Sequence, residues 1–212
     1  MSICLGVPYR TYDDVRVFAE EFLRKHHPGR SIPVPIERIV EKHLRLGIFP
    51  VPDLMIDLDT DGFLTSDLQE IYVDSQICSR VPARYNFTLA HEVGHLVMHA
   101  ALYREYVFTE VHEWKAFHDN LSEKSRARFE LQAYDFAGLV LVPKDHLLCA
   151  VDQQLKEMPA EWKGVGAESI PPRAVEERLR AAISQRICRS FEVSSQVIEK
   201  RLEKEGIIVS GR

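Results

Sequence analysis

Apolar side chains recur at intervals of three and four residues through most of the chain, which is the spacing of one buried helix face. Several of these stretches end at strong helix stops, among them Pro28, Gly47, Pro143 and Gly206. The pattern predicts helices over residues 12–26, 35–45, 86–102, 122–142, 143–157, 171–188 and 196–205.

Strand patterns are confined to three short stretches, residues 48–51, 62–65 and 71–74. Pro50 cannot donate a hydrogen bond to a neighbouring strand, so the first stretch should form an edge strand. Together with the helices, the strands predict an α+β fold that is mainly helical, with a small mixed or antiparallel sheet beside the helix over 86–102. We expect residues 71–73 to form the sheet edge on which an extended peptide could lie.

Asp57, Asp59, Asp61 and Gly62 reproduce the first half of a calcium-binding loop. Such a loop needs a bidentate carboxylate at its twelfth position, and this position holds Leu68. The calcium site is therefore the weaker interpretation. We interpret Asp61-Gly62 as a hairpin turn between strands.

Composition narrows the classes of protein that the chain can belong to. The 212 residues have a net charge of −5, which disfavours non-specific binding of nucleic acid by the whole surface. No secretory signal and no membrane-spanning stretch are recognised, and the four cysteines are scattered without a Cys-x-x-Cys pair. We expect a cytoplasmic protein with reduced thiols and no membrane partner.

The C-terminal part is predicted to be a separate helical subdomain. A stretch rich in Pro, Gly and Ala, residues 158–169, divides the chain into domains 1–157 and 158–212. The last two helices, with Ser194 as a helix cap, resemble a helix-turn-helix. Basic and acidic residues alternate along them, which is more typical of a solvated, salt-bridged face than of a DNA reader, so direct DNA binding is not expected.

The motif His91-Glu92-x-x-His95 carries the strongest chemical signal. Four residues make about one helical turn, so His91 and His95 emerge from the same face and can bind one Zn²⁺. Glu92 lies beside them as a candidate base for the attacking water. The alternative is a helix that carries two histidines by chance, and a third ligand would decide between the two interpretations.

Glu130 is the best candidate for that third ligand. It shares a helix face with Ala133, Tyr134 and Ala137, where an unpaired charge would be unfavourable. An exposed glutamate near the helix start is the competing interpretation. His99 is excluded as a ligand together with His91, because eight residues of helix separate the two by about 12 Å.

Residues 103–120 show no clean period, and a lid, a substrate-contacting loop and a surface insertion all fit them. Their histidines, His112 and His118, are interpreted as ordinary surface residues.

Three ordered blocks of the chain resemble the ImmA/IrrE family of metallo-endopeptidases. The blocks are RYNFTLAHEVGHLVMH at 84–99, ELQAYDFAGLVLVP at 130–143, and FEVS at 191–194 followed by RL at 201–202 and GII at 206–208. The resemblance implies a zincin-like fold in which His91, His95 and Glu130 hold Zn²⁺, with Mn²⁺ as the alternative metal, and Glu92 is the catalytic base. It also implies a substrate, a separately encoded helix-turn-helix repressor that is cleaved to release stress-response or mobile-element genes.

One position departs from the family pattern, because Tyr134 stands where the family usually has asparagine. We expect Tyr134 and His99 to contact the ligands or the substrate without binding the metal themselves. Two other functions stay open from the sequence. One is a metal-bound sensor that sequesters a repressor without cutting it, and the other is a DNA-binding regulator that uses the C-terminal helices.

Overall fold

The computed structural model describes residues 6–106, 108, 111–157 and 172–209. Its contacts divide the chain into two compact units, Met1–Leu141 and Val142–Arg212. Helix α8 (Lys144–Glu157) packs against α10 (Pro172–Phe191) and so belongs to the second unit, whereas the sequence analysis placed it in the first domain. The predicted linker at 158–169 lies outside the described residues, and the division at 157/158 into a peptidase domain and a subdomain stays a prediction.

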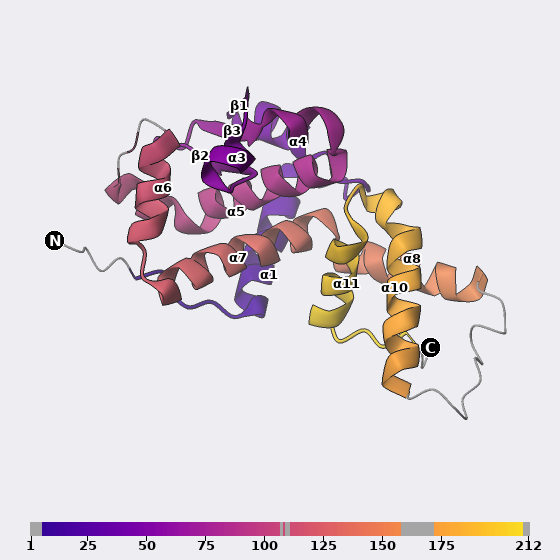
Figure 1. The fold of residues 1–212 in the computed structure, drawn as a ribbon. Coiled ribbons are helices and arrows are strands. Elements are labelled where there is room, and N and C mark those ends of the chain that lie inside the picture. The colour runs from indigo at the N-terminus through magenta and orange to yellow at the C-terminus, as the bar shows by residue number, and fades with distance from the viewer. Residues whose placement is uncertain (1–5, 107, 109–110, 158–171, 210–212) are drawn as a thin grey trace. The chain divides into compact units, whose positions relative to one another are not determined.

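The N-terminal unit is built on two long helices that lie side by side, α5 (Pro82–Glu105) and α7 (Glu123–Leu141) (Figure 1). Helix α1 (Tyr12–His26) packs against α7. These helices confirm the predicted ones, and α5 is longer than expected because Pro82 is accommodated at its first turn. The remaining helices of the unit are α2 (Ile36–Arg38), the π-helical η1 (Ile39–Leu44), α3 (Leu54–Leu58), α4 (Ser75–Arg80) and α6 (Val111–Asn120).

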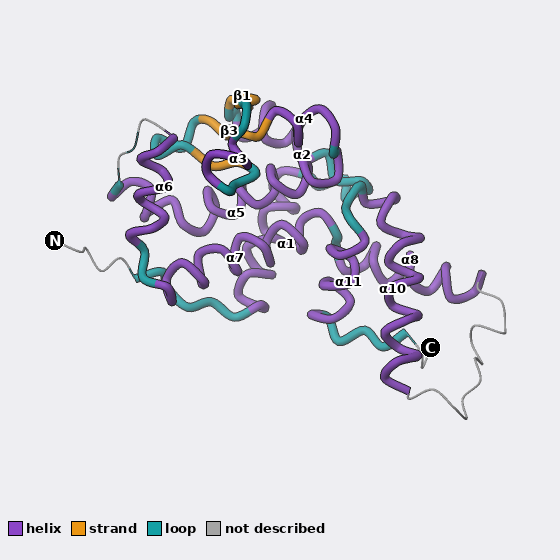
Figure 2. The backbone as a smooth tube through the Cα atoms, in the orientation of Figure 1, coloured by secondary structure: helices purple, strands orange, loops and turns teal. Residues whose placement is uncertain are grey.

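A three-stranded mixed sheet lies along α5 (Figure 2). It consists of β1 (Gly47–Val51), β3 (Glu70–Asp74) and β2 (Gly62–Leu64) in that order, with β1 parallel and β2 antiparallel to β3. The mixed sheet and the edge position of β1 confirm the prediction. The assignment of residues 71–73 to a free edge is wrong, because β1 and β2 occupy both sides of β3. The free edge near α5 belongs to β2.

The Asp-Gly hairpin is also wrong. Residues 54–58 form the short helix α3, and Gly62 is the first residue of β2 rather than part of a turn. The turn that joins β2 to β3 spans residues 65–69 and is closed by the Thr65 N–H, which donates to the Glu70 carbonyl at 2.9 Å. Asp61 instead pairs with Arg84, whose Nε and Nη2 each lie 2.6 Å from a carboxylate oxygen.

Close packing between α5 and α7 depends on Gly94. A Cβ at this position would lie 3.2 Å from the Cα of Ala133 and 3.2 Å from Cδ1 of Phe136, which is tighter than ordinary packing. The neighbours of Gly94 across the crossing are thus Ala133 and Phe136 of helix α7. The two helices therefore approach each other backbone to backbone, and side chains of both can meet in one site.

The C-terminal unit consists of α8, α10 and α11 (Ser195–Lys204). Ser194 caps α11 by accepting a hydrogen bond from the Val197 N–H at 3.4 Å, and Gly206, with a positive φ of 63°, follows its end. Both features confirm the prediction. The core of this unit is apolar and is contributed by all three helices, including Leu147, Val151, Ile183, Ile187, Ile198 and Leu202.

A buried ion pair ties α11 to the start of this unit. The Arg201 guanidinium donates to the Val142 carbonyl through Nε at 3.2 Å and Nη2 at 3.1 Å, and through Nη1 to Glu205 at 2.6 Å. Lys144 Nζ lies 2.9 Å from the second oxygen of Glu205. The side chains of Arg201 and Glu205 are only 3% and 1% exposed.

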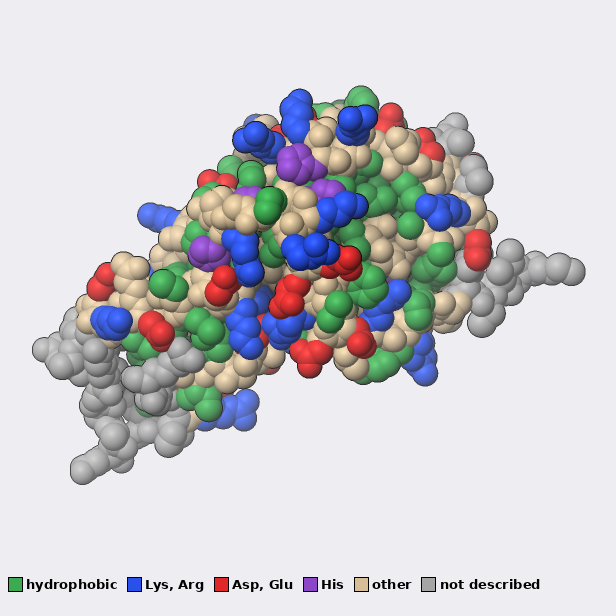
Figure 3. Space-filling model, turned by 180° about the vertical axis from the view of Figure 1, so that it is seen from behind, with side chains coloured by type: hydrophobic (Ala, Val, Ile, Leu, Met, Phe, Trp, Pro, Cys, Tyr) green, Lys and Arg blue, Asp and Glu red, His purple; other side chains and the backbone are tan. Residues whose placement is uncertain are grey.

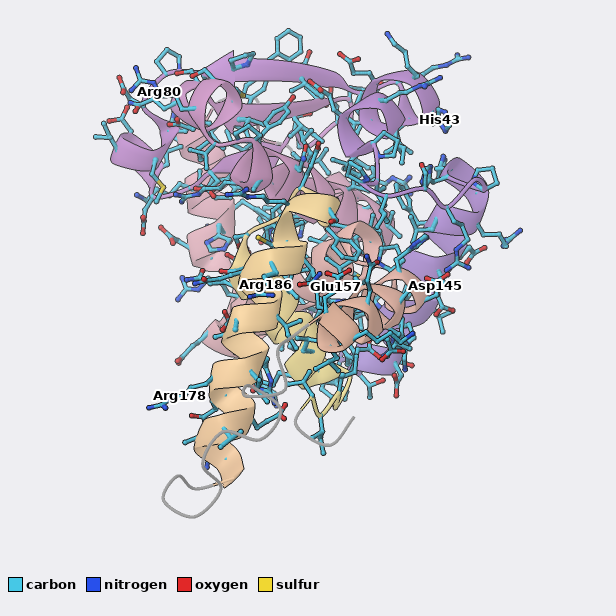
Figure 4. All side chains as sticks on the ribbon, turned by 90° about the vertical axis from the view of Figure 1, so that its right-hand side faces the viewer. His43, Arg80, Asp145, Glu157, Arg178 and Arg186 are labelled. Carbon is cyan, nitrogen blue, oxygen red and sulfur yellow. The ribbon has the colours of Figure 1, made fainter. Side chains whose placement is uncertain are left out.

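The surface of α10 has the mixed charge that the sequence predicted. Arg173 pairs with Glu177 at 3.0 Å and Arg180 with Glu176 at 3.2 Å. Arg178 and Arg186 extend from the same helix (Figure 4). On the face drawn in Figure 3, basic and acidic side chains are likewise interspersed. Within the described ranges, no helix has both the length and the apolar character needed to cross a bilayer.

Candidate metal centre

Helix α5 brings His91 and His95 together, as their spacing predicts. Their Nε2 atoms lie 3.0 Å apart, and both rings are largely buried. Two imidazole nitrogens at this separation face the same point, one helical turn apart. Together with Glu92, they form the one group of at least three metal-ligating side chains found among the described residues, with donor atoms all within 4.8 Å of one another.

Glu130 reaches the same point from α7. Its Oε2 lies 3.2 Å from Nε2 of His91, and its Oε1 lies 2.9 Å from Nε2 of His118. The contact is made across the close α5–α7 packing at Gly94. The structure therefore places Glu130 beside His91, on the side of the helix that the sequence analysis favoured.

Glu92 is buried against the sheet, and its carboxylate accepts a hydrogen bond from the Leu64 N–H of β2. Burial raises the pKa of Glu92 to about 8, and the negative charge of Glu130 adds to the rise. The carboxyl group can therefore gain and lose a proton near neutral pH, as a general acid–base requires.

The surroundings of Glu130 and His95 set the charge that each of them carries. Burial opposes the charged form of Glu130, but hydrogen bonds from His118 and His91 outweigh it and lower the pKa of this carboxyl. Burial lowers the pKa of His95 well below its usual value. Burial also opposes protonation of His91, yet its contact with Glu130 raises its pKa. An anionic oxygen and a neutral imidazole thus face the centre, and both can ligate a cation.

His118 is the residue that sequence reasoning missed. Residues 111–120 form helix α6, and its Trp114 and Phe117 are buried. His118 stacks on Trp114, with ring centroids 5.4 Å apart, and contacts Glu130. It is therefore not an ordinary surface histidine, whereas His112 is exposed as predicted. The segment carried no periodic signal for this contact, because the contact depends on how α6 folds back on the next helix, α7.

A cleft of about 350 Å³ opens over these residues. Tyr134 lies at its lining and is 57% exposed, with its ring 5.0 Å from that of His91 and 5.3 Å from that of Phe87. Tyr134 thus neighbours His91, and its predicted contact with a metal ligand or the substrate stays a prediction. Other lining residues are Met55, Asp59, Thr60, Asp61, Arg84 and Trp114.

His99 lies behind His95, away from the cleft. Nδ1 of His95 and Nδ1 of His99 are 3.0 Å apart, and Nε2 of His99 is 3.0 Å from Oε1 of Gln132. His99 is 1% exposed and Gln132 is 3% exposed. The sequence analysis expected a contact of this kind for His99 but did not identify Gln132 as its partner.

Comparison with protein families decides the affiliation. A model of the IrrE N-terminal-like domain, which describes the peptidase M78 family, matches residues 78–203. The chain belongs to this family. A search of curated proteins found no significant match. The IrrE-like match covers His91, Glu92, His95 and Glu130, and it leaves the sheet and helix α1 outside its bounds.

The residues of this IrrE-like chain fit a metal ion. Membership of a metallopeptidase family indicates a metal cofactor, and the donors present are two imidazole nitrogens and a carboxylate oxygen. Nε2 of His91 lies 3.0 Å from Nε2 of His95 and 3.2 Å from Oε2 of Glu130. Among these three atoms, only a histidine nitrogen can carry a hydrogen. A set of two nitrogens and one oxygen from two rigid helices is typical of catalytic zinc.

Proposed function

We propose that the protein is a zinc-dependent endopeptidase in which His91, His95 and Glu130 hold the metal and Glu92 is the catalytic base. The observation that carries this proposal is the approach of His95 and Glu130 to Nε2 of His91, beside the buried Glu92 and in the lining of one cleft. Mn²⁺ is the alternative metal. Membership of the peptidase family supports the reaction type.

A divalent cation bound there would supply Lewis acidity toward the scissile carbonyl and toward water. Glu92 would accept the proton of the attacking water and then hand that proton to the leaving amine. The Leu64 N–H fixes the carboxylate of Glu92 from the sheet side, so the base is oriented before substrate arrives.

The free edge of β2 is the best place for an extended peptide. Asp61 accepts a hydrogen bond from the Asp74 N–H and Thr65 donates one to Glu70, so alternate residues of β2 face β3. The backbone groups of Gly62 and Leu64 then face the opposite edge, and Gly62 lines the cleft. There the Leu64 N–H is held by Glu92 and the Gly62 carbonyl accepts from the Thr60 hydroxyl at 2.9 Å, so a peptide would pair with the Gly62 N–H and the Leu64 carbonyl. A peptide added there would run past Glu92 with its backbone paired to the sheet.

For the substrate, we propose a helix-turn-helix repressor that is encoded separately and cut to release the genes it controls. The resemblance of three sequence blocks to the ImmA/IrrE family supports this choice. The lining of the cleft by Met55, Phe87 and Tyr134 suits apolar or aromatic side chains of a polypeptide.

The proposal is tested with purified protein, zinc and candidate repressors. We expect about one zinc per chain and discrete repressor fragments by mass spectrometry. Glu92→Gln should keep the zinc and slow cleavage by about 10²- to 10⁴-fold, since it removes the proton acceptor. Proteolysis retained by Glu92→Gln would overturn the assignment of the base. Zinc and repressor binding without any fragments would instead favour a non-cleaving sensor.

A further inference from the structure

The ligand His95 is held from behind by a chain of hydrogen bonds that reaches the N-terminal segment. Its Nε2 faces His91 and the centre, while its Nδ1 faces His99. His99 contacts Gln132 of α7, and Gln132 contacts both Pro8 and Arg10. The two end partners in this chain have fixed hydrogen-bonding roles.

These end partners determine how the Gln132 amide is turned. The Pro8 carbonyl can only accept, so the Gln132 atom 2.8 Å from it must be the NH₂ nitrogen. The Arg10 guanidinium can only donate, so the atom 2.9 Å from its Nη1 must be the amide oxygen. The same oxygen lies 3.0 Å from Nε2 of His99. Oε1 of Gln132 therefore accepts two hydrogen bonds.

The direction of the remaining bonds follows from that orientation. Nε2 of His99 must carry a hydrogen to donate to Gln132, which leaves Nδ1 of a neutral His99 as an acceptor. Nδ1 of His95 must then carry the hydrogen that it donates to His99 across 3.0 Å. The lone pair of a neutral His95 is thereby placed on Nε2, the atom that faces His91.

We propose that Pro8, Arg10, Gln132 and His99 form a positioning relay that sets the tautomer of His95 and fixes the orientation of its ring. The inference rests on the proposed function, in which His95 binds zinc through Nε2. It goes beyond it by making the N-terminal segment a part of the metal site. Pro8 and Arg10 lie outside the region that matches the IrrE-like family, residues 78–203.

The placement of Arg10 supports this role. Its Nη2 donates to the Met98 carbonyl on α5 at 3.3 Å, and its guanidinium lies 5.3 Å from the centroid of the Phe18 ring. The arginine is thus fixed by α5, α1 and Gln132 together. Arg128 provides a matched comparison, because it also holds the N-terminal segment, through the Val7 carbonyl at 3.3 Å, without being part of the relay.

The test measures zinc affinity of the full-length protein by competition with a chelating dye. Gln132→Met keeps the size of the side chain but removes the acceptor, and we expect zinc affinity to fall by about 10- to 100-fold, the range for residues that orient a ligand. Arg10→Met should weaken affinity less, and Arg10→Lys, which restores a donor, should recover most of the loss. Arg128→Met should leave affinity unchanged.

A second readout does not depend on zinc. Imidazole ¹⁵N chemical shifts of the metal-free protein report which ring nitrogen carries hydrogen, and we expect Nδ1 of His95 and Nε2 of His99. In Gln132→Met both rings should show mixed tautomers. Unchanged zinc affinity and tautomers in Gln132→Met would overturn the relay, as would equal losses in Arg10→Met and Arg128→Met. If the unsubstituted protein binds no zinc, the proposed function fails, and the chemical shifts still decide the relay.

Discussion

Two polar clusters, one in each unit, use their charged and polar side chains in different ways. In the C-terminal unit, Arg201 places its donors on the Val142 carbonyl and on Glu205, so positive and negative groups alternate. In the N-terminal unit, the side-chain nitrogen and oxygen atoms of His91, His95 and Glu130 that can bind a metal lie next to one another, with Glu92 beside them. The first cluster pairs opposite charges, whereas the second brings possible metal ligands together.

The difference separates a structural cluster from a functional one. Removing one partner of a buried ion pair should lower the free energy of unfolding, because the other charge then stays buried without a partner. Removing one metal ligand should lower the metal affinity, and it need not lower the stability of the metal-free protein. Substitutions in the two clusters should therefore have opposite signatures.

Glu130→Gln should have the largest effect on metal binding. Structural zinc sites are worth about 10–16 kcal/mol in total, so removing one protein ligand should weaken binding by roughly 3–5 kcal/mol. The free energy of unfolding of the metal-free protein should change by less than about 1 kcal/mol, because the glutamate is partly exposed. Zinc titration and urea unfolding measure the two quantities. Full zinc occupancy in this variant would remove Glu130 from the site.

Arg201→Met should show the reverse signature. It leaves Glu205 buried without its main partner and should lower the free energy of unfolding by about 3–5 kcal/mol, with zinc affinity unchanged. The double variant Arg201→Met with Glu205→Leu should recover most of the loss, since no charge is then buried unpaired. A double variant as unstable as the single one would contradict this account of the cluster.

His118→Ala should weaken zinc binding by about 10- to 100-fold, because Glu130 would lose the hydrogen bond that orients its second oxygen. His112→Ala is the matched control, as His112 is an exposed histidine on the same helix. Equal zinc affinities of the two variants would show that the contact with Glu130 has no role in binding.

Asp74→Ala should have the smallest effect, and the effect is on stability. Here a buried carboxylate is stabilised by backbone N–H groups instead of a cation or a metal. Burial would raise the pKa of Asp74, but the N–H groups of Met55, Gln76, Ile77 and Leu54 outweigh it and lower the pKa. Loss of this helix cap should reduce stability by about 0.5–2 kcal/mol at neutral pH.

The pH dependence of this effect has a definite sign. Because the folded-state pKa is depressed, the contribution of Asp74 is complete above the ordinary pKa of 3.8 and is lost as the pH falls through the lower folded value. Unfolding midpoints of Asp74→Ala and the unsubstituted protein should therefore differ at pH 7 and converge in acid. A difference that persists at low pH would contradict the carboxylate's role.

The parts of the structure that the sequence predicted are those that depend on neighbours along the chain. Helical periodicity located α5 and α7, and a four-residue spacing placed His91 beside His95. Glu130 could be proposed because a charge interrupts the small and apolar face of α7. Its position near His91 could be predicted because two histidine ligands call for a third ligand.

What the sequence did not predict depends on contacts between distant segments. In the sheet, β3 lies between β1 and β2. No pattern of neighbouring residues predicts this order, so the sequence analysis assigned β3 to an edge. Arg10 and Gln132 are 122 positions apart, and His118 meets Glu130 across two helices. Neither pair has a period or motif that would connect its members.

The glycine at the crossing of α5 and α7 has a consequence for how firmly the ligands of the two helices are held together. A methyl group at Gly94 would meet Cα and O of Ala133 at 3.2 and 3.3 Å, so the two helices would have to separate by a few tenths of an ångström. Zn²⁺ holds oxygen and nitrogen ligands at about 2.0–2.2 Å, and a wider gap between Glu130 and the histidines would strain bonds this short. Gly94→Ala should therefore weaken zinc binding although it removes no ligand.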